Sequence, residues 1–305
     1  MSMVLHCFWV ISALFVVRER RVVRLIINLS IFALISFGCF FLLAAPDVAM
    51  SQIVVGVFST IILIVAFENY YRVAGKSAES KKEKKKEHRL LPILFVVALA
   101  ILFIAFIPKG SSVTALKDSY IARFREEIGG ENAVTAIYLG YRLYDTLFEA
   151  LTLLVSIVAV VHLSWYDAVV ATHGKRSDIL ASPIAAVTIR IICPVMLLFC
   201  VYLIANGHVS SGGGFQGGVL AAVFFVCRYL IHDIYDMRID RVLTIEKIVF
   251  LGIAILSVLF FFMGVQTRPP TEKVVYLVTM NLLIGFKVTC VFLIIFYRFI
   301  AFERR

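Results

Sequence analysis

Charged residues are scarce in this sequence, and so are the residue types that mark several soluble or fibrous classes of protein. Only 16% of the 305 residues are charged, whereas 61% are hydrophobic, and soluble domains carry roughly a quarter charged residues. Seventeen glycines and seven prolines are too few for a disordered or collagen-like chain, and six cysteines are too dilute for a disulfide scaffold. With a mean hydropathy of +0.96, the composition excludes a soluble enzyme and predicts a protein of the lipid bilayer.

Motifs for catalysis and cofactor binding are also missing. The sequence contains no phosphate-binding loop, no dinucleotide fingerprint and no nucleophile elbow. Its six histidines and six cysteines show no metal-ligand spacing. We therefore expect no metal, no cofactor and no catalytic centre in this chain, so that any catalysis or electron transfer would take place on other chains. Whether the chain is a subunit of a redox-driven, ion-pumping enzyme complex stays open at this point.

Long apolar runs predict an all-α, polytopic integral membrane protein with about nine transmembrane helices. Crossing a hydrocarbon core about 30 Å thick takes roughly 20 helical residues. The first run is short but lacks the features of a cleaved signal peptide, so we count it as a span; if it lies at the interface, eight spans remain. The expected spans are residues 2–17, 22–45, 48–71, 90–108, 132–164, 183–206, 214–233, 242–265 and 274–299.

The distribution of basic residues predicts how these spans are oriented. The net charge is +10, but we attribute it to membrane topology and expect no nucleic-acid partner, because basic residues gather on the cytoplasmic side of membrane proteins. The expected spans leave 19 Lys and Arg residues on one side and 6 on the other. We therefore expect a protein of the cell (plasma) membrane with its N-terminus outside and its C-terminus in the cytoplasm. The outer side receives Lys109, Lys117, Arg123, Arg125, Arg268 and Lys273.

Two polar stretches divide the chain into three blocks. Residues 76–89 contain a run of lysines too polar to enter lipid, and we interpret them as a basic linker, with binding of anionic lipid headgroups as the alternative. Residues 109–131 are expected to form a short amphipathic helix and a turn outside the membrane. The predicted blocks are residues 1–75 with three spans, 90–175 with two spans and 176–305 with four spans.

Several ionisable residues lie inside the expected spans. Arg142, Asp145 and Glu149 are spaced so that one helical face carries all three. An ionised group near the middle of a span costs about 2.5 to 3.5 kcal/mol on insertion scales. One cation with two anions becomes neutral only with a further proton, metal cation or basic residue, which is the chemistry of an ion relay. A fixed ion network that holds helices together is the equal alternative.

The last expected span contains a single lysine, Lys287, about midway along its length. We expect this lysine to take part in ion transport, by exchanging a proton or by acting on a neighbouring carboxylate, with a purely structural role as the alternative. Glu246 and Lys247 lie within a turn of the cytoplasmic end of the preceding span, and we interpret them as interfacial anchors.

A glycine-rich segment joins the spans at 183–206 and 214–233. Composition alone predicts a tight hairpin at the membrane edge, because consecutive glycines permit backbone angles that other residues rarely adopt. The segment also resembles the B subunit of multisubunit Mrp-type cation/proton antiporters, whose motif has Gly-His, a short gap, Pro-Gly-Gly-Gly-Phe and a Gly-Gly pair. Ser211 stands where that motif has proline, and the matching residues are Gly207, His208, Gly212, Gly213, Gly214, Phe215, Gly217 and Gly218.

The rest of the chain carries related resemblances. The segment 285–288, Gly-Phe-Lys-Val, is similar to the form found in membrane-bound, energy-converting hydrogenases and ferredoxin-linked respiratory complexes. Segments 46–49 (Pro-Asp-Val-Ala) and 144–149, around Asp145 and Glu149, resemble the C-terminal region of the antiporter A subunit. Gln52 replaces a membrane glutamate that is common there, so a cation path here would use Asp145 and Glu149, borrow a carboxylate from another subunit, or be altered.

These resemblances imply a non-catalytic membrane subunit of a multisubunit ion-translocating complex. It would contribute to a Na+ or H+ pathway of an Mrp-type antiporter module, within a hydrogenase-type respiratory complex, and its partners would be the other membrane subunits. The expected pathway residues are Arg142, Asp145, Glu149 and Lys287, with His208 and the segment 212–215 shaping a helix-loop contact. Two alternatives remain: a scaffold subunit that seals and positions its neighbours without conducting ions, and an autonomous carrier.

Overall fold

The computed structural model describes residues 2–74, 112–163, 183–231, 238–262, 264 and 267–301. Within these ranges every regular element is a helix and no strand occurs, so the all-α prediction is confirmed. The expected span at 90–108 and the basic linker at 76–89 lie outside the described residues. The helices are α1 (Ser2–Arg18), α2 (Val22–Leu42), α3 (Pro46–Ala74), α5 (Ser112–Glu127), α6 (Ala133–Ala136), the π-helix η1 (Ile137–Tyr141), α7 (Leu143–Leu163), α8 (Pro183–Asn206), α9 (Gly214–Ile231), α10 (Ile239–Phe262) and α11 (Pro270–Ala301).

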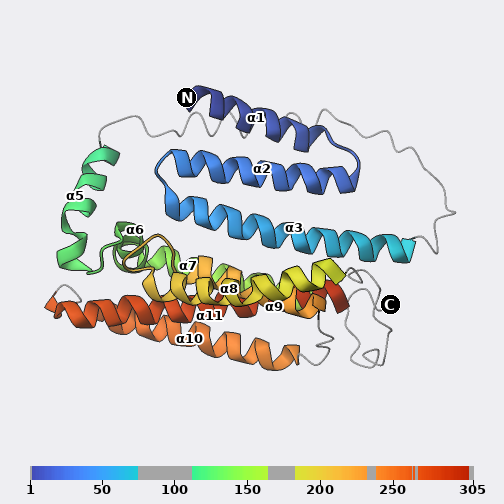
Figure 1. Ribbon diagram of the computed structural model, residues 1–305. Coiled ribbons are helices and arrows are strands. Elements are labelled where there is room, and N and C mark those ends of the chain that lie inside the picture. The colour runs from blue at the N-terminus through green and yellow to red at the C-terminus, as the bar shows by residue number, and fades with distance from the viewer. Residues whose placement is uncertain are drawn as a thin grey trace.

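The expected spans agree closely with these helices. Seven of them, in α1 to α3 and α8 to α11, each coincide with one helix to within a few residues. Among the described residues, six helices are long and apolar enough to cross a bilayer, and the two segments Cys7–Arg18 and Gly214–Tyr229 are apolar but shorter. The helix expected outside the membrane is α5, which lies across one end of the bundle (Figure 1).

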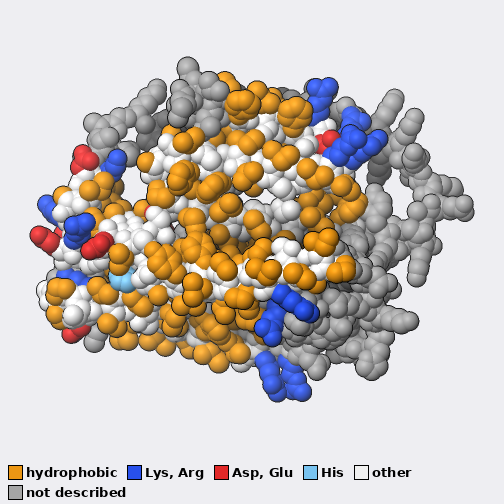
Figure 2. Space-filling view, in the orientation of Figure 1, with side chains coloured by type: hydrophobic (Ala, Val, Ile, Leu, Met, Phe, Trp, Pro, Cys, Tyr) orange, Lys and Arg blue, Asp and Glu red, His pale blue; other side chains and the backbone are white. Residues whose placement is uncertain are grey.

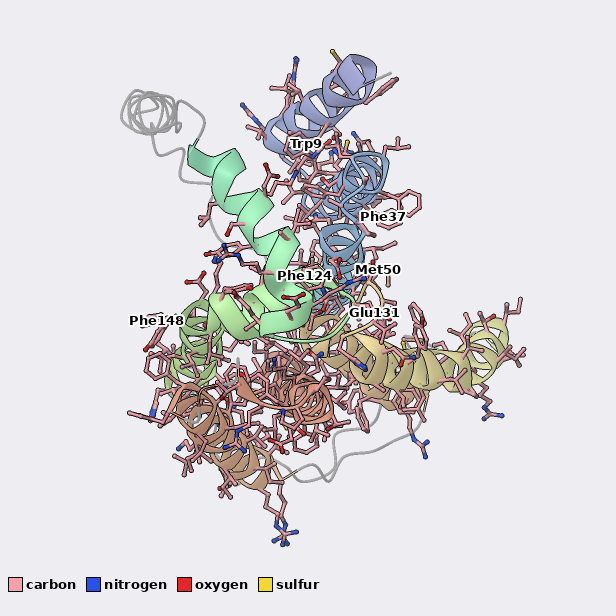
Figure 3. All side chains as sticks on the ribbon, turned by 90° about the vertical axis from the view of Figure 1, so that its left-hand side faces the viewer. Trp9, Phe37, Met50, Phe124, Glu131 and Phe148 are labelled. Atoms are coloured by element: carbon pink, nitrogen blue, oxygen red, sulfur yellow. The ribbon has the colours of Figure 1, made fainter. Side chains whose placement is uncertain are left out.

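The helices form two groups that run roughly parallel to one another. In Figure 1, α1, α2 and α3 lie side by side in chain order, and α3 packs against the second group through α9. Seen along the helix axes in Figure 3, α7 and α8 lie on opposite sides of the second group. The central helix is α11, because 61% of its apolar segment is buried, whereas only 11% of that of α8 is buried.

The outer surface of the bundle is apolar around its middle. Figure 2 shows hydrophobic side chains covering the central band, with charged side chains gathered toward the two ends. Large hydrophobic residues such as Ile184, Leu198 and Phe262 are among the most exposed of the chain. A surface of this kind is stable in contact with hydrocarbon and not with water. The chain is therefore a membrane protein.

The span expected at 132–164 is not one continuous α-helix, which corrects the sequence prediction. The four-residue helix α6 passes into the π-helix η1, and the backbone of Arg142 (φ −113°, ψ 34°) leaves helical geometry before α7 begins. The Arg142 amide donates to the carbonyl oxygen of Ile137 at 2.8 Å, and the Thr146 hydroxyl donates to that of Tyr138 at 2.6 Å. A side chain thus satisfies a carbonyl near the interruption, which makes the break tolerable in a membrane helix.

Candidate functional site

The glycine segment is held at one end of the bundle by a carboxylate from a distant part of the chain. Asp47 lies in the first turn of α3, and its Oδ1 accepts hydrogen bonds from the amide of Gly212 at 3.0 Å and from Asn132 Nδ2 at 3.2 Å. Asp47 is only 8% exposed. A buried carboxylate needs such donors, so these two bonds keep α3 against the glycine segment.

Asn132 connects the same segment to the start of α6. Its Oδ1 accepts from the amide of Val134, which caps the helix, and its Nδ2 donates to the carbonyl oxygens of Gly207 at 3.2 Å and Ser210 at 2.9 Å. The carbonyl oxygen of His208 accepts from the amides of Glu131 at 2.8 Å and Asn132 at 3.0 Å. Backbone and side-chain bonds together fix the glycine segment to α6.

Asn281 of α11 supplies a third attachment. Its Oδ1 accepts from the hydroxyl of Tyr138 at 2.9 Å and from the amide of Gly214 at 3.1 Å. Asn281 is fully buried, and its Nδ2 has no hydrogen-bond partner. We call this set, Asp47, Asn132, Asn281, Tyr138 and residues 207–214, the polar junction. It joins α3, α6, η1 and α11 at one place and brings together all three blocks expected from the sequence.

The glycines of the polar junction are required by geometry at several positions. Gly212 and Gly213 have φ values of 149° and 148°, which side-chain-bearing residues rarely adopt. A Cβ on Gly214 would clash with the carbonyl oxygen of Asn281 and would lie 2.8 Å from Ile284 Cβ. The Phe215 ring contacts Phe292 of α11 edge-on, with 6.4 Å between centroids. The His208 side chain is half-buried, and its Nδ1 lies 3.1 Å from the carbonyl oxygen of Ala205.

Loss of the Asp47 carboxylate should loosen the polar junction. We expect Asp47→Ala to lower the free energy of unfolding by about 1 to 3 kcal/mol, because the Gly212 amide would be left buried without an acceptor. Thermal denaturation of the purified complex would measure this loss. Asp47→Asn keeps an acceptor oxygen and should be milder, and Asp118→Ala on the exposed face of α5 should be neutral. Equal stability of Asp47→Ala and Asp118→Ala would contradict the role given to Asp47.

The charges of Arg142, just before α7, and of Asp145 and Glu149, on α7, lie on the outside of this chain rather than in its interior. Arg142 and Asp145 form an ion pair, and their side chains are 64% and 55% exposed. Glu149 is exposed as well. Figure 3 shows Phe148, which neighbours Glu149 in sequence, pointing away from the bundle. The structure thus brings Arg142 and Asp145 together as expected, and places all three charges where another molecule can reach them.

Lys287 lies in a different environment from the charges of α7. Its ammonium group forms an ion pair with Glu246 of α10, and the two side chains are 1% and 0% exposed. The same ammonium lies 4.8 Å from the centroid of the Phe250 ring, a cation–π contact. These contacts join α10 to α11 in the membrane interior.

The burial of Glu246 corrects its interpretation as an interfacial anchor. α10 begins at Ile239, three residues before the expected start, so Glu246 lies about two turns inside the helix. Its Oε2 has no hydrogen-bond partner. A buried lysine requires an anion nearby, and Glu246 is the one carboxylate within the expected spans of residues 176–305 apart from Asp233, which ends its span. That requirement was the signal in the sequence that could have identified the pair.

Among the described residues, no group of three or more His, Cys, Asp or Glu side chains could hold a metal ion.

Two family models match parts of this chain. Residues 184–294 match a domain related to the MnhB subunit of Na+/H+ antiporter, and residues 7–72 match MbhD, one of the subunits of MBH. The antiporter subunit mnhA2 of Staphylococcus haemolyticus (strain JCSC1435) is 32% identical over 127 residues, which cover 42% of this chain and 15% of the relative. The corresponding subunit of Staphylococcus aureus (strain MRSA252) is 29% identical over 156 residues, covering 51% and 19%. The chain therefore spans less than a fifth of the length of these relatives.

Two solved structures share the fold. One chain of the Mrp complex from Dietzia sp. DQ12-45-1b superposes with a TM-score of 0.72 at 18% identity, covering 97% of this chain and 34% of that chain. A chain of the membrane-bound sulfane sulfur reductase, an archaeal respiratory membrane complex, superposes with a TM-score of 0.53 at 24% identity, covering 68% and 95%. The resemblance inferred from the sequence is thus confirmed: one membrane chain, helical throughout its described elements, carries a segment that matches MbhD and a domain that matches the MnhB-related model.

Proposed function

We propose that this chain is a non-catalytic membrane subunit of a multisubunit ion-translocating complex. In that complex it contributes to the Na+ or H+ pathway of an Mrp-type cation/proton antiporter module. The observation that carries the proposal is the pair of carboxyl side chains, Asp145 and Glu149, on α7, a helix that is otherwise apolar enough to span a membrane. The matches to an MnhB-related domain and to MbhD support it, because both families are named as subunits of larger assemblies.

The proposed pathway passes the exposed face of α7. Asp145 and Glu149 carry two negative charges there against the one positive charge of Arg142. A passing cation or proton would balance the excess negative charge, and Arg142 would hold Asp145 in position. Lys287 and Glu246 lie deep between α10 and α11, where a change in their protonation would alter the field around the pathway. The proposed setting is a hydrogenase-type respiratory complex, in which redox chemistry on other subunits drives ion movement.

The proposed orientation has the N-terminus outside and the C-terminus in the cytoplasm. It follows from the excess of basic residues at one end of the spans. This orientation places the polar junction and α5 at the outer end of the bundle, with the loop between α1 and α2 at the inner end. The three blocks at residues 1–75, 90–175 and 176–305 are proposed as the units that were joined to give the chain.

Neutralising the two carboxylates of α7 tests the proposal. We expect Glu149→Gln and Asp145→Asn to lower ion transport at least about tenfold, because a barrier raised by about 1.4 kcal/mol slows a rate by that factor. The measurement is Na+ and H+ flux in proteoliposomes that contain the whole complex. Asp118→Asn on α5 serves as control and should keep full transport. Normal assembly with full transport in both α7 variants would refute the pathway.

The second candidate is a scaffold subunit that conducts no ions. The polar junction favours it, because the hydrogen bonds of Asp47 and Asn132 serve to hold helices together and leave Asp47 little access to solvent. Under this alternative, the α7 variants would assemble and transport normally, whereas Asp47→Ala would impair assembly.

A further inference from the structure

One strip of the outward face of α7 carries only small or polar side chains, beyond the charges already described. After Asp145 and Glu149 the same face continues with Thr152, Ser156 and Ala159, spaced three or four residues apart, and all five are exposed. These positions span about 21 Å at 1.5 Å per residue, which is most of the hydrocarbon thickness. We call residues 145, 149, 152, 156 and 159 the polar face of α7.

The hydroxyl groups on this face need no hydrogen-bond partner outside α7. Thr152 Oγ1 donates to the carbonyl oxygen of Phe148 at 2.7 Å, and Ser156 Oγ donates to that of Thr152 at 2.7 Å. Both side chains are therefore small and internally satisfied, which lets the backbone of another helix approach closely. The bulky neighbours Tyr144, Phe148 and Val155 stand on one side of the face and remain exposed.

The carboxylates, by contrast, cannot remain in contact with lipid. Glu149 lies six residues into α7, about 9 Å along the helix from Leu143, and an ionised side chain inside the bilayer is costly unless paired or hydrated. The described helices leave this face open. The expected span at 90–108 contains no ionisable residue, so its sequence offers no cation to balance Glu149.

We propose that the polar face of α7 binds a transmembrane helix of another subunit, and that this helix carries a basic side chain opposite Asp145 and Glu149. The three charges at the end of the face sum to −1, so a lysine, arginine or histidine on the partner complements them whenever no transported cation or proton is there. Two copies of this chain would bring two negative faces together, which like-charge repulsion disfavours. The spacing of three and four residues matches the pattern of helices that pack at a small crossing angle.

Photo-crosslinking in the assembled complex tests the interface directly. Benzoylphenylalanine placed at residue 152 or 156 should cross-link to one and the same other subunit. Thr188 of α8 provides the matched control, because its hydroxyl also donates to its own helix, at 2.8 Å to the carbonyl of Ile184, but its neighbours Ile184, Ile191 and Val195 are apolar. A probe at residue 188 should not reach that subunit. The cross-linked helix should contain a basic residue within one turn of the contact.

Bulky substitution gives a second measurement that does not depend on ion flux. Thr152→Phe and Ser156→Phe should lower the amount of that subunit that co-purifies with this chain about tenfold, the effect of a loss near 1.4 kcal/mol, whereas Thr188→Phe should leave it unchanged. Cross-links only to lipid, cross-links to a second copy of this chain, or a partner helix without a basic residue would each overturn the proposal. The proposed interface rests on the proposed membership of a complex but not on the proposed ion pathway. If the probes cross-link as expected and Glu149→Gln abolishes transport, the interface and the pathway are both supported. If the cross-links are missing while Glu149→Gln abolishes transport, the interface is refuted and the pathway is not.

Discussion

Removing one partner of the buried Lys287–Glu246 pair is expected to destabilise the protein by about 3 to 5 kcal/mol, because the remaining charge would be left in the membrane interior without compensation. Lys287→Met leaves the Glu246 carboxylate buried without its partner, and Glu246→Gln leaves the Lys287 ammonium buried without its partner. The double variant Glu246→Gln with Lys287→Met buries no net or isolated charge, so we expect it to recover most of the loss. Thermal denaturation of the assembled complex, analysed as a double-mutant cycle, measures the coupling.

An exposed ion pair at the start of α11 provides the control for this experiment. Arg268 and Glu272 pair at 3.2 Å, with side chains that are 41% and 55% exposed. Exposed pairs contribute about 0 to 1 kcal/mol, so Arg268→Met and Glu272→Gln should have small and nearly additive effects. Two results would show that Lys287 and Glu246 do not depend on each other. In the first, the single variants of the buried pair lose no more stability than these controls. In the second, the stability loss of the double variant equals the sum of the losses of the two single variants.

Alanine at Gly214 or Gly218 is the second change for which we expect a large effect. Both glycines of α9 lie against the backbone of α11: a Cβ on Gly218 would lie 2.5 Å from the carbonyl oxygen of Gly285 and 2.8 Å from Val288 Cβ. Because backbone atoms cannot move aside as a side chain does, the two helices would have to separate. We expect a loss of about 3 kcal/mol in stability, at the upper end of the range for overpacking, seen as a lower midpoint of thermal denaturation.

Two other helical glycines are matched controls for this prediction. A Cβ on Gly38 of α2 or Gly252 of α10 would meet no atom within 4 Å. Alanine at either position should be neutral or stabilise by about 0.5 to 1 kcal/mol, because alanine loses less backbone entropy than glycine when a helix forms. If Gly214→Ala and Gly218→Ala behave like these controls, then α9 and α11 do not pack as closely as the structure indicates.

The helices could be predicted from the sequence because lipid imposes a simple rule on them. An apolar run of sufficient length has to be helical in a bilayer, so helices such as α8 and α11 follow from their apolar residues alone. The π-helix η1 could not be predicted this way. It packs closely against another element at Gly140, where a Cβ would lie 2.7 Å from two carbon atoms of Ile128. Nothing in the local sequence records that contact.

The candidate site was only partly predictable for a related reason. Arg142, Asp145 and Glu149 were recognisable because charges in an apolar run are conspicuous, but whether their face points inward or outward depends on helices far away in sequence. Asn281 was missed because a neutral amide in a long apolar helix is a weak signal, although it accepts hydrogen bonds from two other elements. Glu246 was misjudged because its distance from the membrane surface was counted from a helix start placed three residues too late.

The contact between Asp47 and Gly212 places unequal constraints on the two parts of the chain that it joins. The donor at residue 212 is a main-chain amide, which any residue except proline supplies, so this bond places no demand on the chemistry of a side chain there. The acceptor is a side-chain oxygen of fixed reach at residue 47. This one bond between the segment that matches MbhD and the domain that matches the MnhB-related model is therefore encoded on one side by a single acidic residue and on the other by the path of the backbone. Over evolutionary time, the first can be lost by one codon change, whereas the second is preserved as long as the loop keeps its shape.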